Sequence, residues 1–197
     1  MEQGKSSLIL VPEISLTPQL VNRFRVRFGD SVAVLHSGMD NGERLDEWSR
    51  VRNGSSSIVV GARSAVFATL ENLGLIIVDE EHDASYKQGE NPRYHGRDVA
   101  VYRGFLCKVT VLLGSATPSL ESKRNVKLGK YLLLQLRKRI YQPRLPEVRL
   151  LNLKHCERQK GSPFFSLELI EALRERLNRR EQCLLVLNRR GYAPLVI

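Results

Sequence analysis

Residues 73–88 read LGLIIVDEEHDASYKQ, and this stretch decides the fold that the sequence predicts. The apolar run Leu75–Val78 is typical of a buried β-strand, and the polar residues Asp79 to His82 follow it directly. Parallel α/β sheets bind their ligands at the carboxyl ends of the strands, and adjacent carboxylates at such an end suit divalent-metal chemistry. The alternative is an acidic helix start, which needs only one or two of these residues.

Further apolar runs of strand length lie at 8–11, 32–35, 58–60, 109–113 and 183–187, with helical patterns between several of them. We expect helices after Thr17, Asp40 and Ser166, each of which suits an N-cap, and a weaker helix around 97–105. This alternation predicts an α/β fold with a parallel sheet. The apolar side chains that share one face of the first two helices are Leu20, Phe24, Phe28, Leu45, Trp48 and Val51.

The composition is that of a globular chain of 197 residues, of which 42% are hydrophobic and can form a sizeable core. The net charge of +10 favours a polyanionic partner, nucleic acid above all, although many basic surfaces are merely solvated. No apolar stretch approaches the roughly 20 residues of a transmembrane helix, and the N-terminus lacks a signal-peptide core, so we expect no membrane association and a cytoplasmic location. The three cysteines form no C-x-x-C pair, which predicts neither a disulfide framework nor a zinc site.

A second strand end resembles the first in its organisation. Residues 111–122 read VLLGSATPSLES, in which a strand is followed by the small residues 114–117 and by Pro118, which opens a helix. Taken alone, this pattern is a capped helix after a strand. Together with DEEH, it indicates hydroxyl groups that can bond to the preceding carboxylates or to phosphate.

The pairing of DEEH with SAT is the combination of motifs II and III in superfamily 2 helicases, and the chain as a whole resembles the bacterial primosomal replication-restart helicases of that superfamily. The strings that carry the resemblance are LVPEISLTPQL (10–20), HSGMDNGERLDEW (36–48), VVGARSAVF (59–67), DEEHDASYKQ (79–88), RYHGRDVAVYR (93–103), GSATPSLES (114–122) and LNRRGYAP (187–194). The resemblance covers nearly the whole chain and is weakest over 137–163. It implies an α/β fold with an incomplete RecA-like parallel sheet flanked by helices, followed by the start of a second RecA-like lobe.

The resemblance implies roles in ATP hydrolysis for the DEEH residues. Asp79 would hold Mg²⁺ through its water shell, and Glu80 would orient and deprotonate the attacking water. His82 would link the nucleotide site to the SAT motif, which would couple the two lobes. The residues of that motif are Ser115, Ala116 and Thr117.

The resemblance also implies DNA contacts in three segments. Residues 12–19 are similar to motif Ia, residues 61–64 would contact the DNA backbone with Arg63 paired to a phosphate, and residues 85–98 resemble an aromatic-rich loop that senses single-stranded DNA by stacking and charge. The expected DNA-contacting residues are Pro12, Glu13, Thr17, Gln19, Arg63, Ser64, Tyr86, Lys87, Arg93, Tyr94 and Arg97. For the last segment, the alternative is a solvated loop whose two tyrosines pack on the domain.

We expect helicase lobe 1 at residues 1–136, an interdomain connection at 137–165 and the beginning of lobe 2 at 166–197, where Asn188, Arg189 and Arg190 form a lobe 2 motif. Gly4-Lys5-Ser6 looks like the end of a phosphate-binding loop, but such a loop needs Gly-x-x-x-x-Gly-Lys-[Ser/Thr], and only three residues precede Gly4. The resemblance implies that the family's loop lies upstream and that its zinc ligands and arginine finger lie downstream. We therefore expect no ATPase or unwinding activity from this polypeptide alone.

The function that the resemblance implies is that of a segment of an ATP-dependent 3′ to 5′ DNA helicase in primosome assembly and replication restart. Its implied cofactors are ATP and Mg²⁺, and its implied partners are single-stranded and forked DNA, primosome proteins and single-strand-binding proteins. A noncatalytic DNA-binding remnant of a truncated helicase gene is the alternative. A third hypothesis, another superfamily 2 enzyme such as a nuclease or RNA helicase, is disfavoured by the strings DEEHDASYKQ and NRRGYAP.

Overall fold

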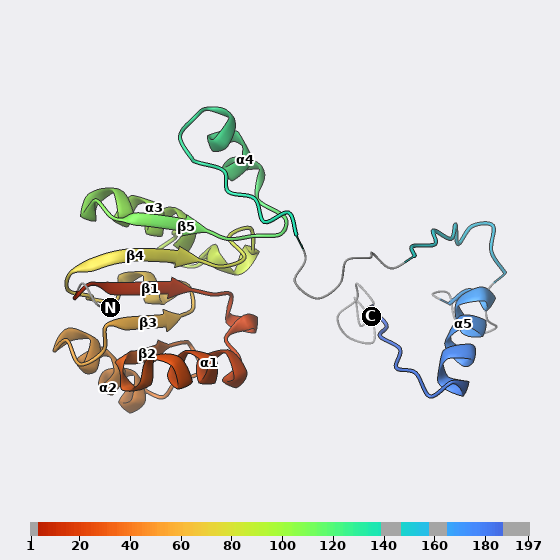
Figure 1. Cartoon of the computed structure of the whole chain (residues 1–197), viewed down its shortest axis with the longest axis horizontal. Helices are drawn as coiled ribbons and strands as arrows, with labels where there is room; N and C mark the ends of the chain where they lie inside the picture. The colour runs from red at the N-terminus through yellow and green to blue at the C-terminus, as the bar shows by residue number, and fades with distance from the viewer. Residues whose placement is uncertain (1–3, 139–146, 158–164, 187–197) are drawn as a thin grey trace. The chain divides into compact units, whose positions relative to one another are not determined.

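The structure, a computed structural model, describes residues 4–138, 147–157 and 165–186 (Figure 1). The chain divides into two compact units, residues 1–134 and residues 135–197. The first unit contains every strand of the described chain, and the second contains one helix.

The first unit is built on a five-stranded sheet in the order β2-β3-β1-β4-β5. Its strands are β1 (Ser6–Leu10), β2 (Val32–Leu35), β3 (Ile58–Gly61), β4 (Leu73–Val78) and β5 (Thr110–Leu113). Every neighbouring pair is parallel, and the arrows in Figure 1 accordingly point the same way. The predicted α/β fold with a parallel sheet flanked by helices is confirmed. Because the strands are parallel, their carboxyl ends meet at one edge of the sheet.

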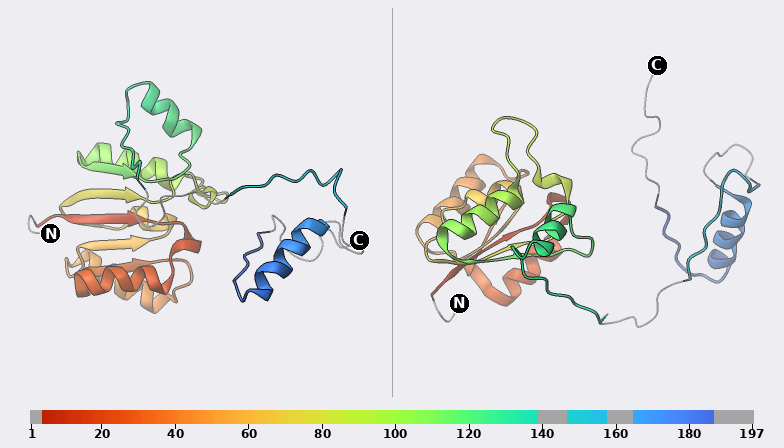
Figure 2. Two further views of the ribbon diagram at one scale, coloured as in Figure 1. Left: turned by 45° about the vertical axis from the view of Figure 1, so that its right-hand side comes forward. Right: turned by 90° about the horizontal axis from the view of Figure 1, so that it is seen from above.

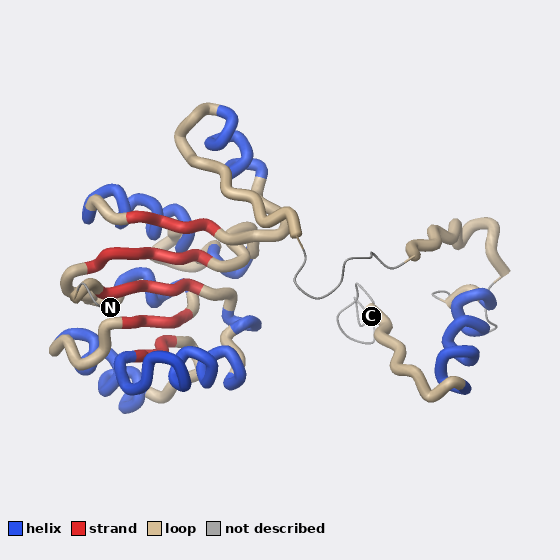
Figure 3. The backbone as a smooth tube through the Cα atoms, in the orientation of Figure 1, coloured by secondary structure: helices blue, strands red, loops and turns tan. Residues whose placement is uncertain are grey.

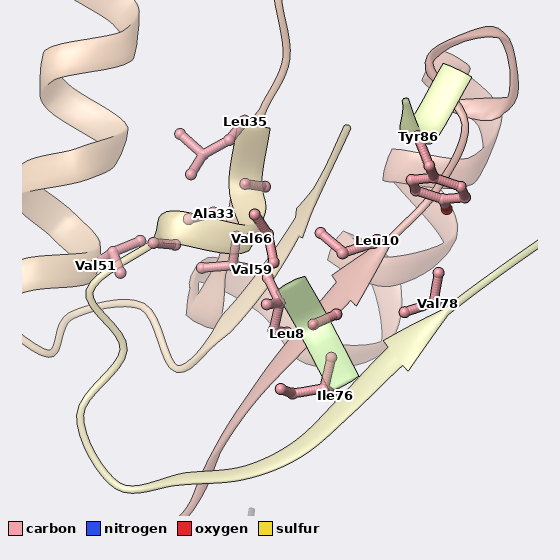
Figure 4. Close-up of a cluster of buried hydrophobic side chains, with 13 residues drawn as sticks. Leu8, Leu10, Ala33, Leu35, Val51, Val59, Val66, Ile76, Val78 and Tyr86 are labelled. Carbon is pink, nitrogen blue, oxygen red and sulfur yellow. The ribbon is translucent and has the colours of Figure 1, made fainter. Parts of the chain in front are cut away.

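The two faces of the sheet pack against different helices (Figure 2). Alternate residues of a strand point to opposite faces, so Leu8 and Leu10 belong to one buried cluster and Ile9 and Val11 to the other. The first cluster, shown in Figure 4, packs against α2 (Asn41–Arg52), η3 (Arg63–Phe67) and α3 (Gly96–Cys107). The second packs against α1 (Pro18–Phe28). Strand β5 lies at the edge of the sheet, where Leu112 is 43% exposed.

The capping residues expected from the sequence are confirmed. Thr17 caps α1 through a bond from the backbone N–H of Leu20, and Asp40 caps α2 in the same way through Glu43. The expectation that Pro118 opens the next helix is wrong, because Ser119 is the cap and α4 (Leu120–Lys127) begins two residues later. The apolar face expected for α2 is buried unevenly, since Val51 is buried and Leu45 is 67% exposed. The remaining short elements are η1 (Glu13–Ser15), η2 (Gly29–Ser31) and η4 (Ala84–Tyr86) (Figure 3).

The second unit contains α5 (Leu167–Asn178), which begins at the predicted cap Ser166. The predicted strand 183–187 is not formed in residues 183–186, and residue 187 lies outside the described part. The physical reason is that a strand needs a hydrogen-bonded neighbour, and no strand of the described second unit is available to pair with it. No helix within the described ranges is both long and apolar enough to cross a lipid bilayer.

Candidate functional site

The carboxyl end of β4 presents two carboxylates. Asp79 is exposed, and its Oδ1 accepts a hydrogen bond from the backbone N–H of Glu80 at 3.1 Å. The backbone of Asp79 stays tied to the sheet, because its N–H donates to the carbonyl of Leu10 at 2.9 Å. Glu80 has a φ of 43°, in a left-handed region that costs a non-glycine residue about 1–2 kcal/mol. The chain therefore turns sharply at Glu80, whose side chain remains 44% exposed.

His82 joins this strand end to the SAT turn that follows β5. Its Nδ1 lies 2.7 Å from Oγ of Ser115 and 3.5 Å from Oε2 of Glu80. Its Nε2 lies 3.3 Å from Oγ1 of Thr117. Within the turn, the backbone N–H of Thr117 donates to Oγ of Ser115 at 2.9 Å. Residues that are far apart in the sequence thus form one polar group around a single imidazole. The sequence pattern had instead indicated bonds from these hydroxyls to carboxylates or to phosphate.

Glu81, to which the sequence analysis gave no role, is only 1% exposed. Its carboxylate accepts hydrogen bonds from Arg97 at 2.9 Å, from the N–H of Ser119 at 2.7 Å and from the hydroxyls of Ser119 and Ser122 at 3.1 and 3.0 Å. Desolvation raises the pKa of Glu81, but the hydrogen bonds from Ser119, Arg97 and Ser122 outweigh it, and the pKa lies below its ordinary value. The sequence offered one hint of this role. Asp79 and Glu80 suffice for the expected metal chemistry, so Glu81 was the acidic residue without an assigned function.

The expected DNA contact Arg97 is only 7% exposed and belongs to this buried group. It donates to Glu81 and, through Nε, to Asp98 at 2.9 Å. Burial lowers the pKa of Arg97, and the bonds to Asp98 and Glu81 raise it by more, so the pKa lies above its ordinary value. In this structure Arg97 is therefore not available to a DNA phosphate.

Tyr86 was expected to offer its ring to a DNA base, but its side chain is buried in the core. The residue is 0% exposed and belongs to the buried cluster in Figure 4. Its hydroxyl donates to the carbonyl of Asp79 at 2.7 Å. Burial and then the nearby charge of Asp79 raise the pKa of Tyr86 above its ordinary value. Its ring packs in the core and has no free face for a base, which is the alternative that the sequence analysis left open.

Arg63 contacts the loop after β4 instead of solvent. Its Nη1 donates to the carbonyls of Ser85 and Lys87, each at 2.9 Å. The guanidinium carbon lies 5.9 Å from the centre of the half-buried Tyr94 ring, which in turn packs edge-on against Phe67. Arg63 and Tyr94, which were both predicted to contact DNA, thus lie close together and interact with each other.

The other predicted DNA contacts differ in exposure. Pro12 is buried, and Thr17 is partly buried and occupied as the cap of α1. Glu13 is exposed and accepts a hydrogen bond from Ser37. The remaining predicted contacts are exposed, and they are Gln19, Ser64, Lys87 and Arg93.

Three further expectations concern metals and the lobe 2 motif. Asn188, Arg189 and Arg190 lie outside the described residues. Within the described residues, no group of three or more His, Cys, Asp or Glu side chains is arranged to hold a metal ion. Cys107, Cys156 and Cys183 are free thiols.

Removing the Tyr86 hydroxyl tests its contact with the strand end. We expect Tyr86→Phe to lower the free energy of unfolding by about 0.5–1.5 kcal/mol, because it removes one buried hydrogen bond and leaves the carbonyl of Asp79 without that donor. Urea unfolding followed by the fluorescence of the single tryptophan, Trp48, measures the change. Tyr102→Phe is the control, since Tyr102 is 62% exposed. Equal effects of the two substitutions would contradict the assignment.

Residues 1–126 match the family model described as DEAD/DEAH box helicase. The chain is 50% identical over its whole length to replication restart protein PriA of Bacillus subtilis and 48% identical to the protein of the same name from Haemophilus influenzae. These alignments cover 24% and 27% of the two relatives, so the chain spans about a quarter of their length. A solved structure of S. cerevisiae Dbp5 bound to RNA and ADP BeF3 is similar over 65% of this chain and 33% of that chain, with a TM-score of 0.44 and 15% identity.

Proposed function

Because the chain belongs to the DEAD/DEAH box helicase family, we propose that it supplies the hydrolytic strand end and the DNA-contacting loops of a helicase that acts in replication restart. The whole-length similarity to two replication restart proteins supports the biological process. We further propose that the reaction is ATP hydrolysis coupled to 3′ to 5′ movement on DNA. Residues 1–136 would form most of lobe 1, residues 137–165 a connection, and residues 166–197 the beginning of lobe 2.

The observation that carries this proposal is the position of His82 between Glu80 and the SAT turn. The imidazole is within 3.5 Å of the Glu80 carboxylate and within 2.7 Å of the Ser115 hydroxyl. A change of charge at Glu80 would therefore alter the interactions of His82 with the hydroxyl groups of the turn after β5. This arrangement supports a site in which hydrolysis and lobe movement depend on each other.

Asp79 suits a magnesium ion. Mg²⁺ uses one or two carboxylates and fills its remaining positions with water and phosphate oxygens, and the exposed carboxylate at the strand end meets this requirement. When bound with ATP, the ion would neutralise charge on the phosphate oxygens. Asp79 would hold it through water molecules, and Glu80 would orient the attacking water and accept its proton.

DNA would run along the edge where the strands end. Lys87 and Arg93 are exposed there, and Ser64 and Gln19 lie beyond the ends of β3 and β1. We propose that these residues contact the DNA backbone directly. We propose that Arg63, Tyr94, Tyr86 and Arg97 instead shape the loop between β4 and α3, because their side chains are engaged with the protein.

Binding of single-stranded DNA tests this interface. We expect an oligothymidylate to bind the chain, with an affinity that falls as salt rises, because each neutralised phosphate contributes about −0.7 to the slope of log K against log salt. Replacing both Lys87 and Arg93 by glutamine is expected to reduce the magnitude of the slope by about 1.4. Fluorescence anisotropy at several salt concentrations measures it.

The matched control uses a lysine at the opposite edge of the sheet. Lys5 precedes β1 and is exposed, so Lys5→Gln removes a charge without touching the proposed interface. If Lys5→Gln changes the slope as much as Lys87→Gln, binding follows the net charge of the chain and the proposed interface is wrong. Tighter binding of an RNA of equal length would favour an RNA helicase over the DNA helicase proposed here.

The chain by itself is expected to lack ATPase activity. The printed sequence contains no Gly-x-x-x-x-Gly-Lys-[Ser/Thr], and without that loop the phosphates lose their backbone N–H cradle. A phosphate-release assay with Mg-ATP and single-stranded DNA is expected to show no turnover above a Glu80→Gln control. DNA-stimulated turnover that disappears in Glu80→Gln would contradict this expectation.

The alternative is a noncatalytic remnant that binds DNA through its basic surface. The net charge of +10 is the observation that keeps this alternative open. Sequencing the gene upstream of Met1 separates the two, since an in-frame phosphate-binding loop favours a working enzyme and a stop codon favours a remnant. For the enzyme, we propose a cytoplasmic location, single-stranded and forked DNA as substrates, and primosome and single-strand-binding proteins as partners.

A further inference from the structure

We propose that Glu81 is a positioning residue that fixes both ends of the turn 114–119 and thereby holds Ser115 and Thr117 against His82. The importance of this turn for hydrolysis rests on the function proposed above, but the positioning itself does not. Glu81 lies between Glu80 and His82, whose side chains are both accessible to solvent, and is itself buried.

The first end of the turn is fixed by the backbone of Glu81. Its N–H donates to the carbonyl of Gly114 at 3.0 Å. The N–H of Gly114 donates to the carbonyl of Val78 at 2.8 Å. Gly114 is therefore bonded on both sides to the chain around the end of β4, immediately after β5 ends at Leu113.

The second end of the turn is fixed by the side chain of Glu81. Oε1 accepts from the backbone N–H of Ser119 at 2.7 Å, and Oε2 accepts from the hydroxyls of Ser119 and Ser122. Ser119 is also the cap of α4, because its Oγ accepts from the N–H of Ser122 at 3.2 Å. The carboxylate thus holds the residue at which the turn ends and α4 begins.

The carboxylate is fully used by these contacts. Oε2 also accepts from Arg97 at 2.9 Å, and the Glu81 side chain is 1% exposed. Glu81 therefore differs from Asp79 and Glu80, which are accessible at the same strand end, and its contribution is geometric.

The residues in the middle of the turn depend on how its two ends are held. Ser115 and Thr117 lie between the two fixed ends, and both approach the imidazole of His82, the residue next to Glu81. Because a single residue fixes Gly114 and Ser119, the distance between the ends of the turn is set by the length of one glutamate. Loosening either end is expected to move the hydroxyls away from His82.

Glu81→Gln tests this positioning in the 197-residue chain itself. Gln has nearly the same shape as Glu. Its amide NH₂ is a donor, however, and cannot accept the hydrogen bonds that one of the carboxylate oxygens accepts. We expect site-resolved hydrogen exchange at 114–127 to accelerate about tenfold or more, and by more than exchange in β1 and β3. In NMR spectra, the imidazole signals of His82 are expected to shift. Asp83→Asn is the matched control for hydrogen exchange, because the Asp83 carboxylate accepts from the N–H of Ser85 and lies two residues away.

A second pair of variants keeps the test valid if Glu81→Gln does not fold. Ser119→Ala removes the hydroxyl at the second end, and Ser119→Thr restores it, so exchange at 114–127 is expected to accelerate in the first and to recover in the second. Equal acceleration in β1 and 114–127 would indicate a general loss of stability and would overturn the proposal. Unchanged His82 signals in both Glu81→Gln and Ser119→Ala would overturn it as well. These measurements need neither nucleotide nor DNA, so failure of the proposed function would leave their outcome unaffected.

Discussion

Glu81→Ala is expected to lower the free energy of unfolding by about 3–5 kcal/mol, the cost of breaking a buried ion pair by removing one partner. The substitution leaves Arg97 with a guanidinium that is 9% exposed and has lost one of its two carboxylate partners. It also removes the acceptor of the Ser119 N–H. Urea unfolding of the 197-residue chain, followed by Trp48 fluorescence, measures the loss.

A double-mutant cycle separates the ion pair from its surroundings. Arg97→Met alone is expected to destabilise the chain as strongly as Glu81→Ala, because it leaves the carboxylate of Glu81 buried without its cation. Glu81→Ala combined with Arg97→Met is expected to cost less than the sum of the two single changes, since neither member of the buried ion pair remains. Asp98→Ala is the matched control on the same arginine: the Asp98 side chain is 62% exposed, and we expect a loss of about 0–1 kcal/mol. Strict additivity would contradict a buried ion pair.

Glu81 also gives the stability of the first unit a dependence on acid. Its pKa in the folded chain lies below its ordinary value of 4.5. A carboxyl group with a lowered folded pKa contributes stability above its unfolded pKa and loses that contribution as the pH falls through the folded pKa. We therefore expect the difference in stability between the unaltered chain and Glu81→Gln to be constant near neutral pH and to shrink below pH 4.5.

Glu80→Gln is expected to lower ATP turnover about 10²–10⁴-fold in a hydrolytically competent polypeptide that contains this chain, the usual contribution of a positioned general base. Gln keeps the size of the side chain but cannot accept the proton of the attacking water. The expected loss is in kcat, with KM for ATP little changed, because the proton transfer occurs only in the transition state. Steady-state phosphate release measures both constants.

The control for Glu80→Gln is a nearby glutamate with no contact to the strand end. Glu90 is exposed in the loop between β4 and α3, and Glu90→Gln removes the same charge. Turnover of Glu80→Gln that stays within a few-fold of Glu90→Gln would remove Glu80 from the role of base.

The strands and caps were predictable because they depend on local patterns. The apolar runs 32–35 and 75–78 are strands or parts of strands, and Thr17, Asp40 and Ser166 cap helices as expected. The run 183–187 follows the same local pattern, yet residues 183–186 are not a strand. Whether a segment pairs with another strand depends on the tertiary structure, and the sequence pattern of the segment alone does not reveal it.

The contents of the candidate site were predictable only in part. The proximity of His82 to Ser115 and Thr117 was implied by the resemblance to the helicases and not by the pattern of strands. The orientations of Tyr86 and Arg63 did not, because an aromatic or basic residue in a loop can face solvent or pack inward with the same sequence. Tyr86 packs inward, where its hydroxyl reaches the carbonyl of Asp79, and Arg63 bonds to two loop carbonyls.

The bonds from Glu81 to Gly114 and Ser119 also bear on how such chains can change in length during evolution. These bonds join the two ends of the segment 82–118. Extra residues at its exposed tip, 89–91, would lengthen a loop that is closed at its base, and closure entropy rises only slowly with loop length. An insertion within 114–119 would instead separate two ends that one glutamate must span. Insertions and deletions among related chains are therefore expected at the tip, while the six positions of the turn keep their number.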